Sequence, residues 1–200
     1  MVKPKLISII KLDNKMNKTR CSWVGKEDIY VDYHDQEWGV PVYESELLFQ
    51  HLLLDGAQAG LSWILILKKR ENYRRLFHHF DPVKMSKMTD PQLNKILLNP
   101  DIVRNKLKVY GFRKNALAYL ELSKKQPFSE FLWDFVGGKP IVNHWKNMSE
   151  VPTATEASMA MSKALKKAGF TFVGTTICYA FMQAVGMVND HTTDCFCYTK

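Results

Sequence analysis

The chain lacks any long apolar run. The longest candidate, residues 6–10, is too short for a signal-peptide core, and it is followed by polar residues up to Arg20 without a small-residue cleavage site. No stretch approaches the roughly 20 apolar residues of a membrane-spanning helix. We therefore expect a protein that does not enter the membrane. We interpret residues 1–19 as a basic, disordered extension, with Met16 as an alternative native start.

Cysteine is scarce as well. Four cysteines in 200 residues are too few for a disulfide scaffold, which favours a reducing cytosol. The motifs GxSxG, Walker A, GxGxxG and HExxH are absent, so the commonest hydrolase, nucleotide-binding and zinc-protease patterns are excluded. His78 and His79 have no matching ligand set nearby, and we interpret them as ordinary surface or core histidines.

Acidic residues are outnumbered, and the formal net charge is +8. Residues 1–15 hold four lysines and one aspartate, which leaves +5 on the remainder of the chain. This balance favours a polyanionic partner. One face of the helix expected after residue 62 is basic, and either a solvated helix face or a DNA contact explains it. Its residues are Lys68, Lys69, Arg70, Arg74 and Arg75.

Apolar residues recur with helical periodicity, and no stretch shows the sustained alternation of a sheet, so the sequence predicts an all-α fold. We expect helix caps at Asp90, which precedes Pro91, and at Thr175. Another is expected at Thr153, with Glu156 three residues later. The expected helices cover approximately residues 45–54, 62–80, 90–98, 103–122, 127–136, 153–168 and 175–185.

The last two expected helices form a hairpin. Gly169 ends the first, residues 170–174 make a tight connection, and Gly174 precedes the second. Backbone amides at the start of the second helix are suited to binding a phosphate. A helical hairpin packed in the core explains the same pattern.

Aromatic and acidic residues crowd the stretch from 21 to 63, a combination suited to stacking a flat heterocycle and bonding its edge; core packing is the alternative. The residues are Trp23, Tyr30, Tyr33, Trp38, Tyr43 and Trp63, with Asp35, Glu37 and Asp55.

Asp55 interrupts an apolar run and precedes a turn that Gly56 and Gly60 bracket. A buried carboxylate must find partners or shift its pKa, so Asp55 is a candidate functional residue, although a solvated acid at a helix end fits equally well. Leu61 follows the turn. It is interpreted either as an apolar wedge for a base stack or as a buried leucine.

Two pairs of cysteine and histidine lie near opposite ends of the chain. Cys21 and His34 have the spacing C-x12-H, and His191 and Cys195 have H-x3-C. Together they offer the four nitrogen and sulfur ligands of a tetrahedral zinc site that would join the two ends. Two buried thiols and two ordinary imidazoles are the alternative. Cys178 lies within an expected helix and Cys197 lies just past a better-placed ligand, so neither is included.

Long motifs then connect the chain to a known family. They are RCSW at 20–23, YHDQEWGVP at 33–41, QAGLSW at 58–63, KKRENY at 68–73 and FVGTTICY at 172–179. The chain resembles the 3-methyladenine DNA glycosylase I family, the zinc-containing bacterial members of the helix-hairpin-helix DNA glycosylases, from Arg20 to about Tyr198. The resemblance implies one catalytic domain over residues 20–200, with two helical lobes and a base pocket between them.

The resemblance also implies residue roles. The ligands of one structural zinc would be Cys21, His34, His191 and Cys195. Tyr33 and Trp63 would embrace the excised base, with Tyr30, Trp23 and Trp38 as walls of the pocket. Asp55 would be the catalytic, base-contacting carboxylate, at a position where the family usually has glutamate. Asp190 would support a zinc ligand. DNA would be bound by the turn with Gly60 and Leu61 and by the hairpin, with Gly169, Phe172, Gly174 and Thr175.

The implied activity is base-excision repair: hydrolysis of the N-glycosidic bond of 3-methyladenine in alkylated double-stranded DNA, after the nucleotide is flipped out. The protein would act as a cytoplasmic, nucleoid-associated monomer without a nucleotide cofactor. Asp55 in place of glutamate keeps one alternative open. That alternative is a module that binds alkylated DNA without cutting it.

Overall fold

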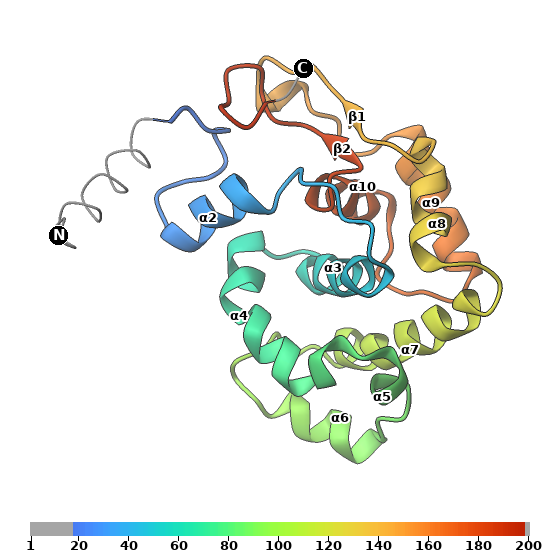
Figure 1. Cartoon of the computed structure of the whole chain (residues 1–200). Helices are drawn as coiled ribbons and strands as arrows, with labels where there is room; N and C mark the ends of the chain where they lie inside the picture. Colours follow the sequence, from blue (N-terminus) through green and yellow to red (C-terminus); the bar gives the residue numbers. More distant parts are fainter. Residues whose placement is uncertain (1–17, 199–200) are drawn as a thin grey trace, which may run out of the picture.

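The computed structural model describes residues 18–198, and this part of the chain is mostly helical (Figure 1), which confirms the all-α prediction. None of its helices is long and apolar enough to cross a membrane. The α-helices are α2 (Asp28–Gln36), α3 (Ser45–Gln58), α4 (Trp63–Leu76), α5 (Pro82–Ser86), α6 (Asp90–Leu97), α7 (Lys106–Ser123), α8 (Phe128–Trp133), α9 (Glu156–Lys167) and α10 (Thr175–Ala184). Short 3-10 turns are η1 (His78–Phe80), η2 (Asp134–Val136) and η3 (Met148–Glu150).

Helix α3 forms the centre of the core. Its residues 52–57 are all buried, and α4, α7, α8 and α10 pack around it. Figure 1 shows α3 in the middle of the molecule, with α4, α7 and α10 on different sides of it. A helix that is apolar on nearly all sides is expected at such a position. A polar side chain in the buried segment 52–57 therefore lies among apolar neighbours, and this applies to Asp55.

Two short strands join the C-terminal part to the segment after α8. Strand β1 (Ile141–Val142) pairs in parallel with β2 (Val188–Asn189), with Ile141 opposite Val188 and Val142 opposite Asn189. A ladder of two residues per strand is too short to produce alternation in the sequence, and none was predicted. The residues after β2, including His191, lie against the first described residues, near Cys21.

The structure corrects three expected helix starts. Thr89, not Asp90, precedes α6 and forms a capping box with Gln92, and Thr155, not Thr153, does the same for α9 with Ser158. Gly174 is the residue before α10, so Thr175 is its first helical residue.

The expected helix over residues 62–80 ends at Leu76, because His78, His79 and Phe80 have positive φ. The helix expected from Val103 begins at Lys106. Gly56 lies inside α3 and so does not belong to the turn, whereas Gly60 does, with φ of +76°.

The basic face of α4 bonds mainly within the protein. Lys69 donates to the carbonyl of Pro100 at 3.0 Å, Arg70 binds Glu37, and Arg74 donates to Gln50 at 3.3 Å. These contacts favour the interpretation as a helix face over that of a DNA contact.

The beginning and end of the described chain lie side by side. The backbone amide of Phe196 donates to the carbonyl of Thr19 at 2.9 Å, and Cys21 lies close to His191. Of the predicted extension over residues 1–19, residues 1–17 lie outside the described residues, Met16 among them.

Candidate active site and metal centre

The cysteines and histidines paired by spacing meet in one buried cluster. The Sγ of Cys195 lies 3.4 Å from Nε2 of His34 and 3.4 Å from Nδ1 of His191, and the Sγ of Cys21 lies 3.5 Å from Nδ1 of His191. Tetrahedral ligands about 2.0–2.3 Å from a zinc ion are separated by roughly 3.3–3.8 Å. The four atoms, all within 4.8 Å of one another, therefore fit one tetrahedral metal ion.

Hydrogen-bond partners outside the cluster fix the orientation of the two imidazole rings, so that one nitrogen of each ring points to the centre of the cluster. Nδ1 of His34 lies 2.9 Å from Asp35, which accepts two hydrogen bonds from Arg20 at 2.8 and 2.7 Å. Nε2 of His191 lies 3.2 Å from the carbonyl of Trp38. Each of these outer nitrogens is a donor, so the other nitrogen of each ring presents its lone pair to the cluster. Burial opposes ionisation of Asp35, but the bonds from Arg20 and His34 outweigh it and lower its pKa.

The Asp190 carboxylate bonds to residues other than His191, so any support that it gives this ligand passes through the backbone and not through the imidazole. The side chain is fully buried and accepts four hydrogen bonds of 2.6–2.8 Å, from donors in two segments, α10 and the segment after β1. The donors are Asn143, Trp145, Tyr179 and Gln183. Asp190 thereby fastens β2 to α10 and to the segment after β1.

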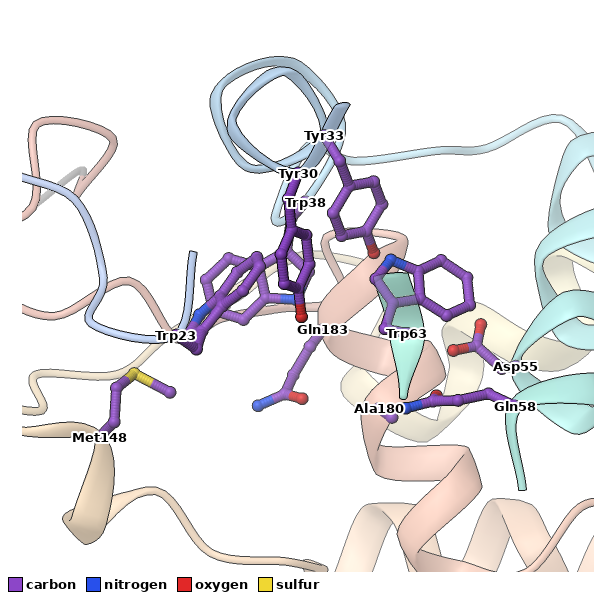
Figure 2. Close-up of a pocket in the computed structure, with 10 residues that line it drawn as sticks. All are labelled: Trp23, Tyr30, Tyr33, Trp38, Asp55, Gln58, Trp63, Met148, Ala180 and Gln183. Carbon is purple, nitrogen blue, oxygen red and sulfur yellow. The ribbon is translucent and has the colours of Figure 1, made fainter. Parts of the chain in front are cut away.

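An aromatic pocket of about 240 Å³ (Figure 2) lies next to the cluster, which it meets at Trp23. Trp23 joins the two, since its ring centroid is 5.4 Å from that of His34 and 5.0 Å from that of Trp38. Tyr33 and Trp63 form another wall, with centroids 5.4 Å apart. The lining residues are Trp23, Tyr30, Tyr33, Trp38, Asp55, Gln58, Trp63, Met148, Ala180 and Gln183. The structure thus brings together the five aromatic residues assigned to a pocket and Asp55.

Two polar groups of this pocket are buried without a partner. Among the described residues, neither Oδ2 of Asp55 nor Nε1 of Trp63 has a hydrogen-bond partner. Asp55 is 3% exposed, and burial raises its pKa well above the ordinary carboxyl value. Figure 2 shows both side chains on the same side of the pocket, with the Tyr33 hydroxyl directed at the indole. An acceptor and a donor that are buried and unsatisfied fit a ligand with a complementary polar edge.

Three residues of the same sequence stretch do not line the pocket. Tyr43 is half exposed and stacks on Trp133 with a centroid distance of 4.4 Å. Asp35 bonds to His34 of the cysteine and histidine cluster, and Glu37 is held by Arg70. The aromatic and acidic residues of this stretch therefore have different environments: the pocket, the support of His34, and an ion pair.

Sequence reasoning missed four residues of the pocket. Gln58 lies at the end of α3, Met148 in η3, and Ala180 and Gln183 in α10. Ala180 and Gln183 are three residues apart on one helix, so they share a face, but no feature of the sequence directs that face to the aromatic residues. The Asp190 carboxylate fixes the Gln183 amide through a bond of 2.7 Å.

The turn expected to contact DNA follows the C-terminal end of α3, and Phe172 of the hairpin packs near Gly56 at the same end of this helix. Leu61 is half buried and follows Gly60 at the surface, where a side chain on Gly60 would meet nothing within 4 Å. In the hairpin, Gly169 and Phe172 have positive φ, and Gly174 opens directly to space before Thr175 begins α10. The first amides of α10 have no partner within their own helix, as in any helix N-terminus.

Comparison with known proteins gives a consistent result. A family model described as methyladenine glycosylase matches residues 23–198. The chain is 53% identical over 183 residues to a Haemophilus influenzae protein named DNA-3-methyladenine glycosylase, covering 91% of this chain and 99% of that protein. It is 52% identical over 180 residues to DNA-3-methyladenine glycosylase 1 of Escherichia coli, covering 90% and 96%.

Solved structures agree with these relatives. A crystal structure of a 3-methyladenine DNA glycosylase I superimposes with a TM-score of 0.90 at 49% identity, covering 90% of this chain and all of that one. A structure that describes 3-methyladenine recognition by the Staphylococcus aureus enzyme superimposes with a TM-score of 0.87 at 36% identity, covering 90% and 97%.

Proposed function

The chain belongs to the methyladenine glycosylase family, and we propose that its aromatic pocket takes up 3-methyladenine flipped out of double-stranded DNA. Its activity is that of a monofunctional DNA-3-methyladenine glycosylase of base-excision repair. The observation that carries the proposed role of the pocket is the buried, unpaired Asp55 carboxyl among stacked aromatic rings.

The chemistry requires little acid catalysis. The 3-methyladenine of an alkylated nucleotide carries a positive charge, so its bond to C1′ breaks as the electron pair moves to the base. The base leaves neutral. The oxygen of water bonds to C1′, and the water proton passes to solvent. The enzyme therefore contributes mainly by extruding and orienting the nucleotide.

The pocket residues suit a cationic purine. Stacking on Tyr33 and Trp63 favours an electron-poor ring by cation–π attraction, on the order of 0.5–2 kcal/mol for each contact. Asp55 accepts hydrogen bonds from the purine edge, and the indole N–H of Trp63 offers a donor. Trp23, Tyr30 and Trp38 complete the walls. Gln183, with its amide fixed by Asp190, adds a polar group opposite Asp55.

Binding to duplex DNA is assigned to two elements. Leu61, carried by the turn at Gly60, fills the gap that the flipped nucleotide leaves. The hairpin with Gly169, Phe172 and Gly174 brings the amides at Thr175 to a phosphate. We further propose a monomer with one catalytic domain over residues 20–200, acting in the bacterial cytosol on nucleoid DNA.

The cluster of Cys21, His34, His191 and Cys195 is proposed to hold one structural zinc ion. Two thiolates and two imidazoles are the donor set that zinc prefers in closed sites. The ion would fasten the N-terminal segment to the residues after β2. This keeps Trp23 and Trp38, which contact the histidines of the cluster, in place as pocket walls.

Base release separates catalysis from binding alone. We expect the protein to release 3-methyladenine from an alkylated duplex in a single-turnover assay. Hypoxanthine should be released at least about 100-fold more slowly, because Asp55 is proposed to act in its charged form and therefore does not protonate an uncharged leaving group. Tight binding of alkylated DNA without any released base would establish the non-catalytic module. Efficient hypoxanthine release would instead assign acid catalysis to the pocket.

The wedge role of Leu61 is tested by Leu61→Ala. The side chain is only half buried, so the variant is expected to fold with a loss of about 1 kcal/mol or less, while excision from duplex DNA falls about 10-fold. Binding of free 3-methyladenine should stay unchanged, since Leu61 does not line the pocket. Measurement of both quantities distinguishes a wedge from a core leucine, whose loss would lower thermal stability and leave excision by the folded fraction intact.

A further inference from the structure

One stripe of α7 contacts both elements assigned to DNA binding. Lys108, Gly111 and Asn115 are spaced by three and four residues, so they lie on the same face of the helix. All three are buried. Lys108 faces the turn that carries Leu61, Asn115 faces the hairpin, and Gly111 lies between them.

Lys108 holds the C-terminal end of α3. Its Nζ donates to the carbonyl of Ala57 at 2.8 Å and to that of Ala59 at 2.6 Å. These carbonyls belong to the last turn of α3 and to the residue after it, where helix geometry leaves acceptors unpaired. The two bonds fix the backbone on both sides of Gln58, immediately before Gly60 and Leu61.

The position of this lysine is unfavourable for its own helix. Lys108 lies in the first turn of α7, near the positive end of the helix dipole, and its side chain is only 6% exposed. Burial lowers its pKa. The carbonyls of Ala57 and Ala59 explain the location of this lysine. It bonds both of them, and no other side chain among the described residues does so.

Asn115 holds the hairpin by pairing with the backbone of one residue. Its Nδ2 donates to the carbonyl of Thr171 at 3.0 Å, and its Oδ1 accepts from the Thr171 amide at 2.8 Å and hydroxyl at 3.1 Å. Because the Asn115 side chain bonds both the carbonyl and the amide of Thr171, it fixes the backbone conformation of the hairpin at this residue. It does so next to Phe172, which has a φ of +58°.

Phe172 fills the space between the two anchors. A Cβ on Gly111 would lie 3.2 Å from its ring, and a Cβ on Gly56 of α3 would lie 3.2 Å from its Cβ. Phe172 therefore packs against α7 and α3 at positions that only glycine leaves open. The turn at the end of α3 and the hairpin are thus connected through one packed residue as well as through α7.

We propose that α7 is a fixed spacer between the two DNA-binding elements, with Lys108 and Asn115 as positioning residues. The spacer sets the Leu61 turn at one distance from the hairpin, so that the wedge enters the base stack where the hairpin holds the strand. Neither residue lines the base pocket. This inference depends on the proposed roles of the turn and the hairpin in duplex binding.

Lys108→Met and Asn115→Leu remove the bonds and keep the approximate size of the side chains. At a temperature where circular dichroism shows every variant folded, each is expected to lower single-turnover excision from duplex DNA about 10- to 100-fold. Affinity for free 3-methyladenine should change less than about threefold. The loss of excision in the double variant should be clearly smaller than the product of the two single losses. Both substitutions act on the same quantity, the position of the Leu61 turn relative to the hairpin.

Lys114→Met is the matched control, since it removes the same charge from an exposed position on α7. It should leave excision within about twofold of the wild type. If Asn115→Leu does not fold, Gly111→Ala takes its place, because its methyl group displaces Phe172 from the same helix. Unchanged excision by the folded variants, or losses that multiply, would overturn the spacer. Absence of base release by the wild type would overturn the proposed function instead.

Discussion

Replacing Cys195 with alanine is expected to release the proposed zinc ion and to lower the melting temperature by about 10 °C or more. The free energy of binding a structural metal contributes to folding, and loss of one of four ligands removes most of it. A loss of about 3–5 kcal/mol corresponds to a shift of this size in a chain of 200 residues. Excision should fall together with stability, because Trp23 and Trp38 contact the histidines of the cluster.

Elemental analysis and thermal denaturation measure the two effects. The wild type should contain about one zinc ion per chain, and the Cys195→Ala variant almost none. Cys197→Ala is the matched control, because Cys197 lies two residues from Cys195, is less buried, and is one of the two cysteines that the proposed ligand set leaves out. Equal metal loss in both variants would show that the ligand set is wrong. A wild type that is metal-free and equally stable would contradict the metal site itself.

The sequence predicts this cluster well because ligand chemistry is restrictive. Few residue types bind zinc, so two cysteines and two histidines at suitable spacing already form a set, although 156 positions separate His34 from His191 in the numbering. The role of Asp190 is different. Adjacency to His191 suggests a supporting contact, but the donors that surround Asp190 come from segments whose packing no local pattern specifies.

The pocket residues likewise divide into those that local sequence predicts and those that only tertiary packing brings there. Asp55 is predictable because a carboxylate within an apolar helix is unusual, and burial in α3 agrees with that expectation. Gln183 and Met148 have ordinary sequence contexts and enter the pocket only through the packing of α10 and η3. The helix starts were wrong by one or two residues at Asp90, Thr153 and Thr175, since several neighbouring residues of each site can cap a helix and tertiary contacts decide among them.

Asp55→Asn is expected to lower excision of 3-methyladenine about 100-fold while making the free protein more stable at neutral and alkaline pH. The carboxylate is buried without a partner, so its ionisation destabilises the fold unless a cationic base is bound. The native state binds the proton of Asp55 more tightly than the unfolded chain does. Stability of the wild type therefore falls as the pH rises from about 3.9, the ordinary carboxyl pKa, through the raised native pKa.

The proposed function accounts for this cost, because the charged form of Asp55 is the one proposed to accept hydrogen bonds from a cationic purine. Excision by the wild type should accordingly increase with pH through the pKa of Asp55, and Asn should remove that dependence. The stability advantage of Asp55→Asn should be largest above the native pKa and vanish near pH 4.

Asp55→Glu is the control: it keeps the charge, introduces the residue that the family resemblance implies at this position, and is expected to excise within about 10-fold of the wild type. Melting curves from pH 4 to pH 8 and single-turnover rates test both effects. An Asn variant that excises normally, or that is no more stable than the wild type at pH 8, would show that Asp55 is neither the base-recognising group nor a buried charge.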